Sequence, residues 1–514
     1  MVDTAHTYVI VGAGPAGLQL SYHLQQQGAD YVTFERGAEP GGFFRRFPRH
    51  RRLNSTNTVH TASADPETRL RWDGNSLLND SPDLLFPNFS RDYQPSADDL
   101  VRYLAEFQRV HQLRVRYGTT VERITREDDG FSVRTDRGGV RARCLVVATG
   151  WGRPFVPDIP GIEHATGYEE MDVDPDRYAG RRVLIIGKGN AAFETAAALL
   201  GSASTVHLAS RRPVRLAWQT GHPGDVRGRH GAILDSHRST TPHAVLDCTV
   251  DRIRPVDGGF RVRVTHAGGG TAELDYHAVL RCTGFRTDTT VFDAGCRPEL
   301  AHDGRIPALR PDWQSSNVDD LYFAGTVAQA RDLRHASSPF IDGFRYNLRT
   351  LTRILRERYE DVPLPGATTP GEPASLAKVM LDRVNGSSAL WTQFEYLGDV
   401  LVRDRATGDF RHYEDLPEDY ALARFADAAH CYTLTLRWGR DDSGDDPAVD
   451  RHPTPTPTPG RVNAGLHPVL RRYRHGELLA EQHLPEDLSA EWRRPDRHVQ
   501  PLVEFLMADL NGGS

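Results

Sequence analysis

The stretch "YVIVGAGPAGLQL", residues 8–20, decides the fold of this chain. Its apolar run from Tyr8 to Val11 predicts a buried strand of a parallel sheet, and a G-x-G-x-x-G pattern follows without a gap. We expect a helix that ends near Gly28 and then a second strand, "YVTFE", that ends at Glu35. Strand, glycine turn, helix, strand and acid in this order predict a dinucleotide-binding unit.

The glycines and the acid of this unit each have a physical task. Gly12 allows the tight turn, Gly14 lets the backbone approach a pyrophosphate, and Gly17 lets the helix pack close to the strand. The pyrophosphate is expected at the positive end of the helix, and Glu35 is expected to accept hydrogen bonds from a ribose. The predicted cofactor-binding residues are Gly12, Gly14, Pro15, Ala16, Gly17, Glu35 and the adjacent Arg36.

A second motif, "RVLIIGKGNAAFETAAALL" at residues 182–200, repeats the design. A strand over 183–186 leads into a glycine turn and a helix that we expect to end near Gly201. The next strand, "TVHLAS", delivers arginines where the first unit has an acid, which favours the 2′-phosphate of NADPH over NADH. A solvated basic turn is the alternative. The candidate residues are Gly187, Lys188, Gly189, Asn190, Ala191, Ser210, Arg211 and Arg212.

Two such motifs predict an α/β fold with two Rossmann-like dinucleotide-binding domains, the first for FAD and the second for NADPH. The later segments "CLVVATG", "AVLRCTGF" and "DDLYFAGT" read as strands, and the last is expected to return to the FAD domain. The NADP domain would then be inserted in the FAD domain. Further candidate cofactor residues near these strands are Val121, Thr149, Gly150, Gly284 and Gly325.

The domain organisation that follows is discontinuous. The predicted segments are an FAD-binding domain at 1–160 and 290–362, an NADP-binding domain at 161–289, a linker at 363–373 and a C-terminal α+β region at 374–514. The C-terminal region has no recognisable catalytic pattern. Three roles stay open for it: it covers the active site, recognises a substrate or forms a subunit interface. Its "PTPTPTPG" run, 453–460, predicts an exposed polyproline-type loop.

The motifs "GAGPAG", "FERGAEPGGFF", "ATG", "GKGNAA" and "CTGF" resemble the flavin-containing monooxygenase group of flavoproteins. The resemblance to one member of this group extends over nearly the whole chain, through "RFPRHRRL", "NSLLNDSP" and "FIDGFRY". It implies that the Gly-Gly-x-aromatic element lies along FAD, with Gly42, Phe43 and Arg45 as cofactor residues. The group's fingerprint is degraded here to "IPGIEHATGY", and the ending Tyr168-Glu169 disfavours Baeyer–Villiger chemistry.

The resemblance also implies a mechanism. NADPH would reduce the flavin, O₂ would form a C4a-hydroperoxide, and a nucleophilic nitrogen or sulfur of a small molecule would take the distal oxygen. Asn57, and after it Asn54, are the residues expected to steady the oxygen adduct, with turn capping as the alternative for either. Two other functions stay open: an NADPH oxidase or reductase that passes electrons to O₂, a quinone or a thiol partner, and a flavoprotein that mainly binds.

The run "FFRRFPRHRRLN", residues 43–54, concentrates positive charge in a chain of net charge −7. That balance argues against a nucleic-acid binder. We expect Arg45 or Arg46 to approach a cofactor phosphate and the other arginines to pair with carboxylates, and an anionic substrate is the alternative. Pro48 makes one continuous helix improbable.

The remaining features bound the function class. The 514 residues contain no apolar run of 18, which predicts that no segment spans a membrane. The N-terminus reads as a strand, so we expect a cytoplasmic protein. A homodimer is possible. Five cysteines without a Cys-x-x-Cys pair predict neither a redox dithiol nor a metal site, and Cys144 and Cys282 read as core residues. His164 is expected to be structural. In the segment 215–231, Trp218, His222 and Asp225 either face the nicotinamide or a substrate, or lie on ordinary surface.

Overall fold

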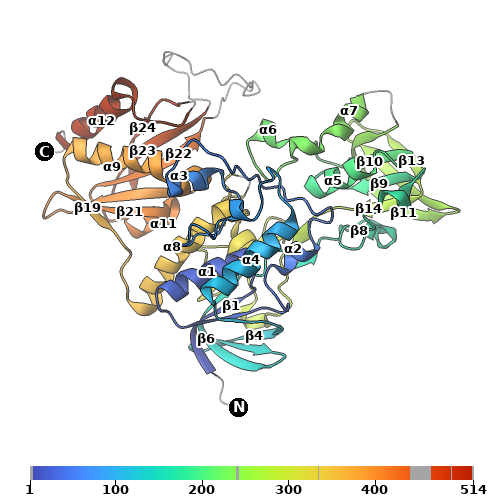
Figure 1. Cartoon of the computed structure of the whole chain (residues 1–514), viewed down its shortest axis with the longest axis horizontal. Helices are drawn as coiled ribbons and strands as arrows, with labels where there is room; N and C mark the ends of the chain where they lie inside the picture. Colours follow the sequence, from blue (N-terminus) through green and yellow to red (C-terminus); the bar gives the residue numbers. More distant parts are fainter. Residues whose placement is uncertain (1–3, 239–241, 334, 440–464, 488, 512–514) are drawn as a thin grey trace.

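The computed structural model describes residues 4–238, 242–333, 335–439, 465–487 and 489–511 (Figure 1). These residues form three large sheets, which we call the N-terminal, inserted and C-terminal sheets. The inserted and C-terminal sheets lie on opposite sides of the N-terminal sheet (Figure 1). The predicted polyproline-type loop at 453–460 lies outside the described residues.

The N-terminal sheet is built around the first strand of the chain. Its strands are β1 Thr4–Val11, β2 Tyr31–Phe34, β3 Val115–Arg116, β4 Val121–Glu127, β5 Gly130–Thr135, β6 Gly138–Val147 and β18 Leu321–Phe323. Their order is β3-β2-β1-β6-β5-β4, and β18 pairs in parallel with β6. Since β18 comes after every strand of the inserted sheet, the last strand does return to the first domain, as predicted. Tyr8, Val9 and Ile10 of β1 are fully buried.

Three helices pack on this sheet. They are α1 Pro15–Gln26, α4 Ala97–His111 and α8 Ile341–Glu360. The end of α1 lies two residues before Gly28, close to the predicted position, and α4 begins where the Ser96 side chain accepts a hydrogen bond from the backbone of Asp98. Helix α8 packs against α1 and passes toward the C-terminal sheet.

The inserted sheet repeats the arrangement around the second motif. Its strands are β8 Thr166–Gly167, β9 Arg182–Ile186, β10 Thr205–Ser210, β11 Ala244–Val256, β12 Gly259–His266, β13 Thr271–Tyr276 and β14 Ala278–Arg281, with helices α5 Asn190–Leu199 and α7 Ala232–Arg238. The order is β13-β12-β11-β10-β9-β14-β8. The two segments that lead into and out of the inserted part lie side by side, because β7 Arg153–Pro154 pairs with β15 Phe285–Arg286.

The C-terminal sheet is antiparallel throughout its described strands. They are β19 Ala367–Thr369, β20 Leu397–Arg403, β21 Phe410–Pro417, β22 Cys431–Trp438, β23 Leu466–Arg474 and β24 Glu477–His483, in the order β19-β21-β20-β22-β23-β24. Its helices are α9 Pro373–Gly386, α10 Ser388–Thr392, α11 Glu418–Arg424 and α12 Gln500–Asn511. Residues 367–369, predicted as linker, are an edge strand of this sheet, so that part of the linker prediction is wrong. The predicted α/β fold class with a C-terminal α+β region is confirmed.

Short elements connect these parts. They are α2 Gly42–Arg46, α3 Pro66–Arg69, α6 Ala217–Thr220, β16 Leu300–Ala301, β17 Ile306–Pro307, the 3₁₀ turns at 70–72, 86–88, 162–164, 175–178, 228–230, 294–296 and 325–328, and a π turn at 495–499. Within the described residues no helix is long and apolar enough to cross a membrane. All five cysteines are buried and unpaired, and the core positions predicted for Cys144 and Cys282 are confirmed at 0% and 5% exposure.

A buried ion cluster anchors the C-terminal sheet to α8. Arg383 of α9 lies 2.5 Å from Asp399 and 2.8 Å from Asp415, two fully buried carboxylates. Arg349 of α8 lies 2.7 Å from Asp415, and His412 lies 2.9 Å from Asp399. Burial by itself would raise the pKa of Asp399, but Arg383 and His412 together hold that pKa below its ordinary value.

The arginine-rich segment 43–54 contacts the inserted domain through aromatic rings and hydrogen bonds, and we call this contact the clasp. Phe47 stacks on Tyr168 with 5.6 Å between ring centroids and meets Phe285 edge-on at 5.1 Å. Arg49 donates from its backbone N–H to the Tyr168 hydroxyl (2.8 Å) and from Nη2 to the Met171 carbonyl (2.6 Å). The segment is therefore a contact between the two nucleotide domains, which its composition did not reveal.

Most arginines of this segment already have partners. Helix α2 ends at Arg46, before Pro48, as the proline predicted. The ion pairs are Arg45–Glu39, Arg51–Asp98 and Arg52–Asp92. The guanidinium of Arg46 lies 5.6 Å from the ring centroid of Phe47. The pairing with carboxylates is confirmed for Arg51 and Arg52, whereas Arg49 donates to a backbone carbonyl, and contact of Arg45 or Arg46 with a phosphate stays a prediction.

We expect Asp399→Ala to destabilise the protein by about 3–5 kcal/mol, because Arg383 and His412 would lose their buried carboxylate. The matched control is Asp382→Ala, on the helix that carries Arg383, which removes only an exposed pair with Lys378 and should cost less than about 0.5 kcal/mol. Urea-induced unfolding measures both. Equal, small losses for the two variants would contradict the anchoring role of the cluster.

The clasp also predicts a pH dependence. Glu194 of α5 is 8% exposed, 3.5 Å from the Tyr168 hydroxyl, and burial raises its pKa to about 7. The unfolded chain ionises this carboxyl at its lower, ordinary pKa, so stability falls as pH rises from that value through about 7. Glu194→Gln should therefore raise the melting temperature relative to wild type more at pH 8 than at pH 5. Glu170→Gln, at an exposed site, is the control, and a pH-independent effect of Glu194→Gln would refute the expectation.

Candidate functional site

The first glycine turn forms a tight junction with open space on one side. Gly12 has φ +106°, and a side chain there would begin 2.7 Å from the carbonyl oxygen of Ala148. A side chain at Gly17 would begin 1.9 Å from the carbonyl oxygen of Gly12, so the helix approaches the strand as closely as glycine permits. At Gly14 no atom lies within 4 Å of that position. This open side, at the N-terminus of α1, fits a pyrophosphate.

The acid at the end of β2 lies beside this turn. Glu35 accepts hydrogen bonds from the backbone N–H of Ala13 and of Gly37, each at 2.8 Å, which orients the carboxylate for a ribose. Arg36 is exposed beside it. The hydroxyl of Tyr117 is buried near Glu35 without a partner in the described residues, and burial, followed by Glu35, raises its pKa. Sequence analysis missed Tyr117, although its place just after β3 brings it to the same sheet edge.

The predicted crossover residues converge on the first turn with one exception. Thr149 and Gly150 follow β6, and Thr149 Cα lies 3.2 Å from the side-chain position of Gly12. A side chain at Gly325 would begin 2.5 Å from Ala16 Cβ, so the return strand ends against the first turn of α1. Val121 begins β4, two residues after Thr119, whose N–H donates to the Glu35 carbonyl (2.9 Å), so it follows a segment beside the first site. The exception is Gly284, which follows β14 and lies just before β15, at the end of the inserted sheet.

The second glycine turn has the same construction. Gly187 has φ +129° and would place a side chain 2.2 Å from the carbonyl oxygen of Cys282, whereas nothing lies within 4 Å at Gly189. Ala191 is half-buried in the first turn of α5. Lys188 differs from the prediction: its side chain is 4% exposed, forms an ion pair with Asp247 and donates to the carbonyl of Arg212 (3.3 Å). Its charge is therefore neutralised by Asp247, and its role is to hold the arginine turn.

The end of β10 matches the prediction for a phosphate site. Ser210 ends the strand, and Arg211 and Arg212 are exposed. Neither guanidinium forms an ion pair or a hydrogen bond with any part of the chain that the structure describes. Their positive charge is thus available to a bound anion at the position where the first unit has Glu35.

The segment after β10 folds back over the start of α5. Asn190 holds it through three hydrogen bonds, to the carbonyls of Gly224 and Asp225 and from the N–H of Arg227, all at 3.0 Å. Asp225 accepts from Arg215 Nε (3.0 Å) and Thr220 Oγ1 (2.8 Å), so it stabilises the loop and does not face a ligand.

Two further residues of this segment have separate places. The ring centroid of His222 lies 6.2 Å from that of Phe340, just before α8, so the segment reaches the first domain. Trp218 is 59% exposed. His164, expected to be structural, lies 6.3 Å from the ring of Phe260 in the connection to the inserted sheet.

The two candidate asparagines differ in which atoms are available. Asn57 is 2% exposed, and its Nδ2 donates to the Ser90 carbonyl (2.8 Å) and at longer range to the Asp92 carbonyl (3.4 Å). Asn54 accepts on Oδ1 from Arg229 Nη2 (3.3 Å), and its own Nδ2 makes no hydrogen bond within the described residues. An oxygen adduct needs N–H donors, so the geometry favours Asn54, and the preference for Asn57 is not supported.

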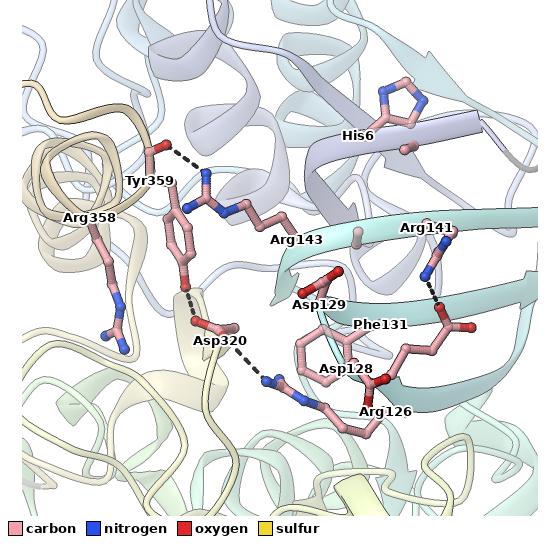
Figure 2. Close-up of a pocket in the computed structure, with 13 residues that line it drawn as sticks. His6, Arg126, Asp128, Asp129, Phe131, Arg141, Arg143, Asp320, Arg358 and Tyr359 are labelled. Atoms are coloured by element: carbon pink, nitrogen blue, oxygen red, sulfur yellow. Dashed lines mark hydrogen bonds and ion pairs between the residues drawn. The ribbon is translucent and has the colours of Figure 1, made fainter.

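A pocket of about 590 Å³ elsewhere in the molecule does not fit the predicted chemistry (Figure 2). It borders Ala5 and His6, at the start of β1, opposite the strand ends where dinucleotides bind. Several of its polar side chains contact one another or nearby backbone. Arg143 donates to the Tyr359 carbonyl (3.0 Å), Tyr359 donates to Asp320 (2.5 Å), and Arg126 lies 3.2 Å from Asp320.

Comparison with known proteins agrees with this geometry. The family model described as pyridine nucleotide-disulphide oxidoreductase matches residues 9–325. The chain is 34% identical to FAD-dependent oxidoreductase domain-containing protein 2 of Mus musculus over 558 residues, which cover 97% of this chain and 83% of the mouse protein. It is 31% identical to indole-3-pyruvate monooxygenase YUCCA1 of Oryza sativa subsp. japonica over 193 residues, or 36% of this chain and 43% of the rice protein.

Among solved structures, a flavin-containing monooxygenase from Stenotrophomonas maltophilia aligns with a TM-score of 0.54 and 20% identity, over 69% of this chain and 99% of that one. This likeness shows a shared fold. The matches confirm the resemblance to flavin-containing monooxygenases and the predicted cofactor classes, FAD and a nicotinamide dinucleotide. The chain therefore belongs to the pyridine nucleotide-disulphide oxidoreductase family and is a flavin-dependent oxidoreductase.

Proposed function

We propose that the chain is an NADPH-dependent FAD monooxygenase that oxygenates a nucleophilic nitrogen or sulfur of a small molecule. The observation that carries this proposal is the contact between Asn54 and Arg229, which joins the two nucleotide domains and leaves the Asn54 amide hydrogens available as donors. When bound, FAD supplies hydride acceptance from the nicotinamide and the activation of O₂.

The residues of the chain bind, orient and exclude water around that chemistry. The turns at Gly12–Gly17 and Gly187–Gly189 would hold the two pyrophosphates. Arg229 donates to Gln94 Oε1 (3.0 Å) as well as to Asn54, so it fixes the inserted domain against the first domain. Phe43 and Phe47 of the first domain pack on Phe285, which follows the last strand of the inserted sheet. Their apolar surface keeps water from the seam and favours oxygen transfer over loss as peroxide.

The cysteines argue against one alternative function, a reductase that passes electrons to a thiol partner through a dithiol of its own. Every cysteine is buried and unpaired, and burial raises the pKa of Cys282 and of Cys431 to about 12. A thiolate, which such exchange requires, is therefore suppressed. The activity for which the rice relative is named, that of an indole-3-pyruvate monooxygenase, supports oxygenation. The proposed partners are O₂ and a small nucleophile, with no role for nucleic acid or a membrane.

The test compares the time course of O₂ uptake with that of peroxide release. The FAD-loaded protein is reduced with one equivalent of NADPH and mixed with O₂, without any substrate. A monooxygenase retains the oxygen, so peroxide should appear only after a lag. Peroxide release that keeps pace with O₂ uptake would identify an oxidase and overturn the proposal.

Asn54→Ala should shorten this lag by about tenfold or more, because one lost hydrogen bond of about 1.4 kcal/mol changes a rate tenfold. Reduction by NADPH should change little. The matched variant, Asn57→Ala, should leave the lag nearly unchanged and instead lower stability by about 1–3 kcal/mol, since it strips a donor from buried backbone carbonyls. The assignment is wrong if Asn57→Ala abolishes the lag and Asn54→Ala does not.

The double variant Arg211→Ala/Arg212→Ala would lose one or two charge-assisted contacts with the 2′-phosphate. It should therefore raise the Kd for NADP⁺ by up to about 100-fold, while the Kd for NAD⁺ stays within about twofold. The loss is confined to the ligand with a 2′-phosphate. Titration calorimetry on the oxidised protein gives both constants. Equal losses for NADP⁺ and NAD⁺, or none for either, would show that these arginines are a solvated turn.

A further inference from the structure

Arg227 is a charged side chain without a partner in an otherwise well-paired loop. The guanidinium of Arg227 makes no ion pair or hydrogen bond within the described residues, and its Nε is buried. Arg215 and Arg229, its neighbours in the loop, are both engaged, with Asp225 and with Asn54. Burial lowers the pKa of Arg227, and Asp342 acts on it only at longer range. An unpaired guanidinium held partly out of water is costly unless an anion joins it.

The backbone that carries this guanidinium is held by Asn190. The amide of Asn190 donates to the carbonyls of Gly224 and Asp225 and accepts from the N–H of Arg227, each at 3.0 Å. Three hydrogen bonds engage both hydrogens and the oxygen of the amide, so Asn190 has little left for a ligand. It instead pins Arg227 next to the first turn of α5, directly after the glycine turn.

The loop that carries Arg227 is built independently of any ligand. Val226 is 2% exposed, its N–H donates to the Arg215 carbonyl (2.9 Å), and its carbonyl accepts from the N–H of Ala217 (2.9 Å). Asp225 closes the loop through Arg215 and Thr220. The guanidinium is therefore presented on a pre-ordered support, which lowers the entropy cost of binding.

We propose that Arg227, positioned by Asn190, binds the pyrophosphate of the nicotinamide dinucleotide. The open side of Gly189 and the N-terminus of α5 already offer backbone N–H groups to this pyrophosphate, but the turn lacks a free cation, because Lys188 is paired with Asp247. Arg227 supplies the missing charge. Arg211 and Arg212, beyond β10, would hold the 2′-phosphate, so the pyrophosphate and the 2′-phosphate would be bound by different arginines.

The same anionic chemistry has a second possible source, the carboxylate of a substrate. Binding of two phosphate ligands shows whether Arg227 contacts the pyrophosphate or is left for a substrate carboxylate. NADP⁺ contains the pyrophosphate and the 2′-phosphate, whereas 2′-AMP contains only the latter. Binding is measured on the oxidised, FAD-loaded protein without turnover, so the result does not depend on whether oxygen is transferred and separates this inference from the proposed function.

Arg227→Gln should weaken NADP⁺ binding by about tenfold or more and leave 2′-AMP binding unchanged, whereas Arg227→Lys should keep most of the affinity. Arg238→Gln removes an exposed arginine of the same domain and is the charge control. Calorimetry at constant ionic strength gives the constants. FAD content and melting temperature equal to wild type show that the variants are folded.

Asn190→Ala tests the positioning role. It should weaken NADP⁺ binding to a similar extent, and the double variant with Arg227→Gln should bind no more weakly than Arg227→Gln alone, because both changes remove one interaction. Additive losses would contradict the positioning role. Unchanged NADP⁺ affinity in Arg227→Gln would overturn the proposal and leave the charge to a substrate carboxylate, and a parallel loss of 2′-AMP binding would move the contact to the adenosine end.

Discussion

The close approach of Gly17 to Gly12 is the contact on which the rest of the structure depends. A side chain at Gly17 would begin 1.9 Å from the Gly12 carbonyl oxygen, so α1 can leave β1 in this direction only with glycine there. A side chain at Gly325 would likewise begin too close to Ala16, which lies in the first turn of α1. The first strand, the first helix and the returning strand β18 therefore converge at one point. The space on the open side of Gly14 is the place left for the pyrophosphate.

The parts that surround this point act on one another through α8. The ion cluster of Arg349, Arg383 and their buried aspartates fixes the C-terminal sheet to the middle of α8. The residue before α8, Phe340, meets His222 from the loop of the inserted domain. The C-terminal region thus holds the helix whose start forms one wall of the seam between the nucleotide domains. The clasp of Phe47 on Tyr168 supports the same seam from the other side.

The sequence predicts the local features of both nucleotide sites and fails where a tertiary partner decides. Glycine spacing determined both turns, the end of α1 and the return of β18, because these follow from backbone geometry. The ion pair of Lys188 could not be predicted, because Asp247, its partner, lies 59 residues away in the chain. The choice between Asn54 and Asn57 depends on which backbone carbonyls face each amide, which no spacing reveals. Likewise β19 looks like a linker until β21 is beside it.

The central claim is that oxygen from O₂ reaches a nucleophile at the seam between the two nucleotide domains. Turnover with NADPH under ¹⁸O₂, with a simple sulfide or tertiary amine present and catalase added to destroy free peroxide, tests it by mass spectrometry. The account predicts one ¹⁸O atom in the oxygenated product, the other leaving as water. Consumption of NADPH without any ¹⁸O-labelled product would contradict it.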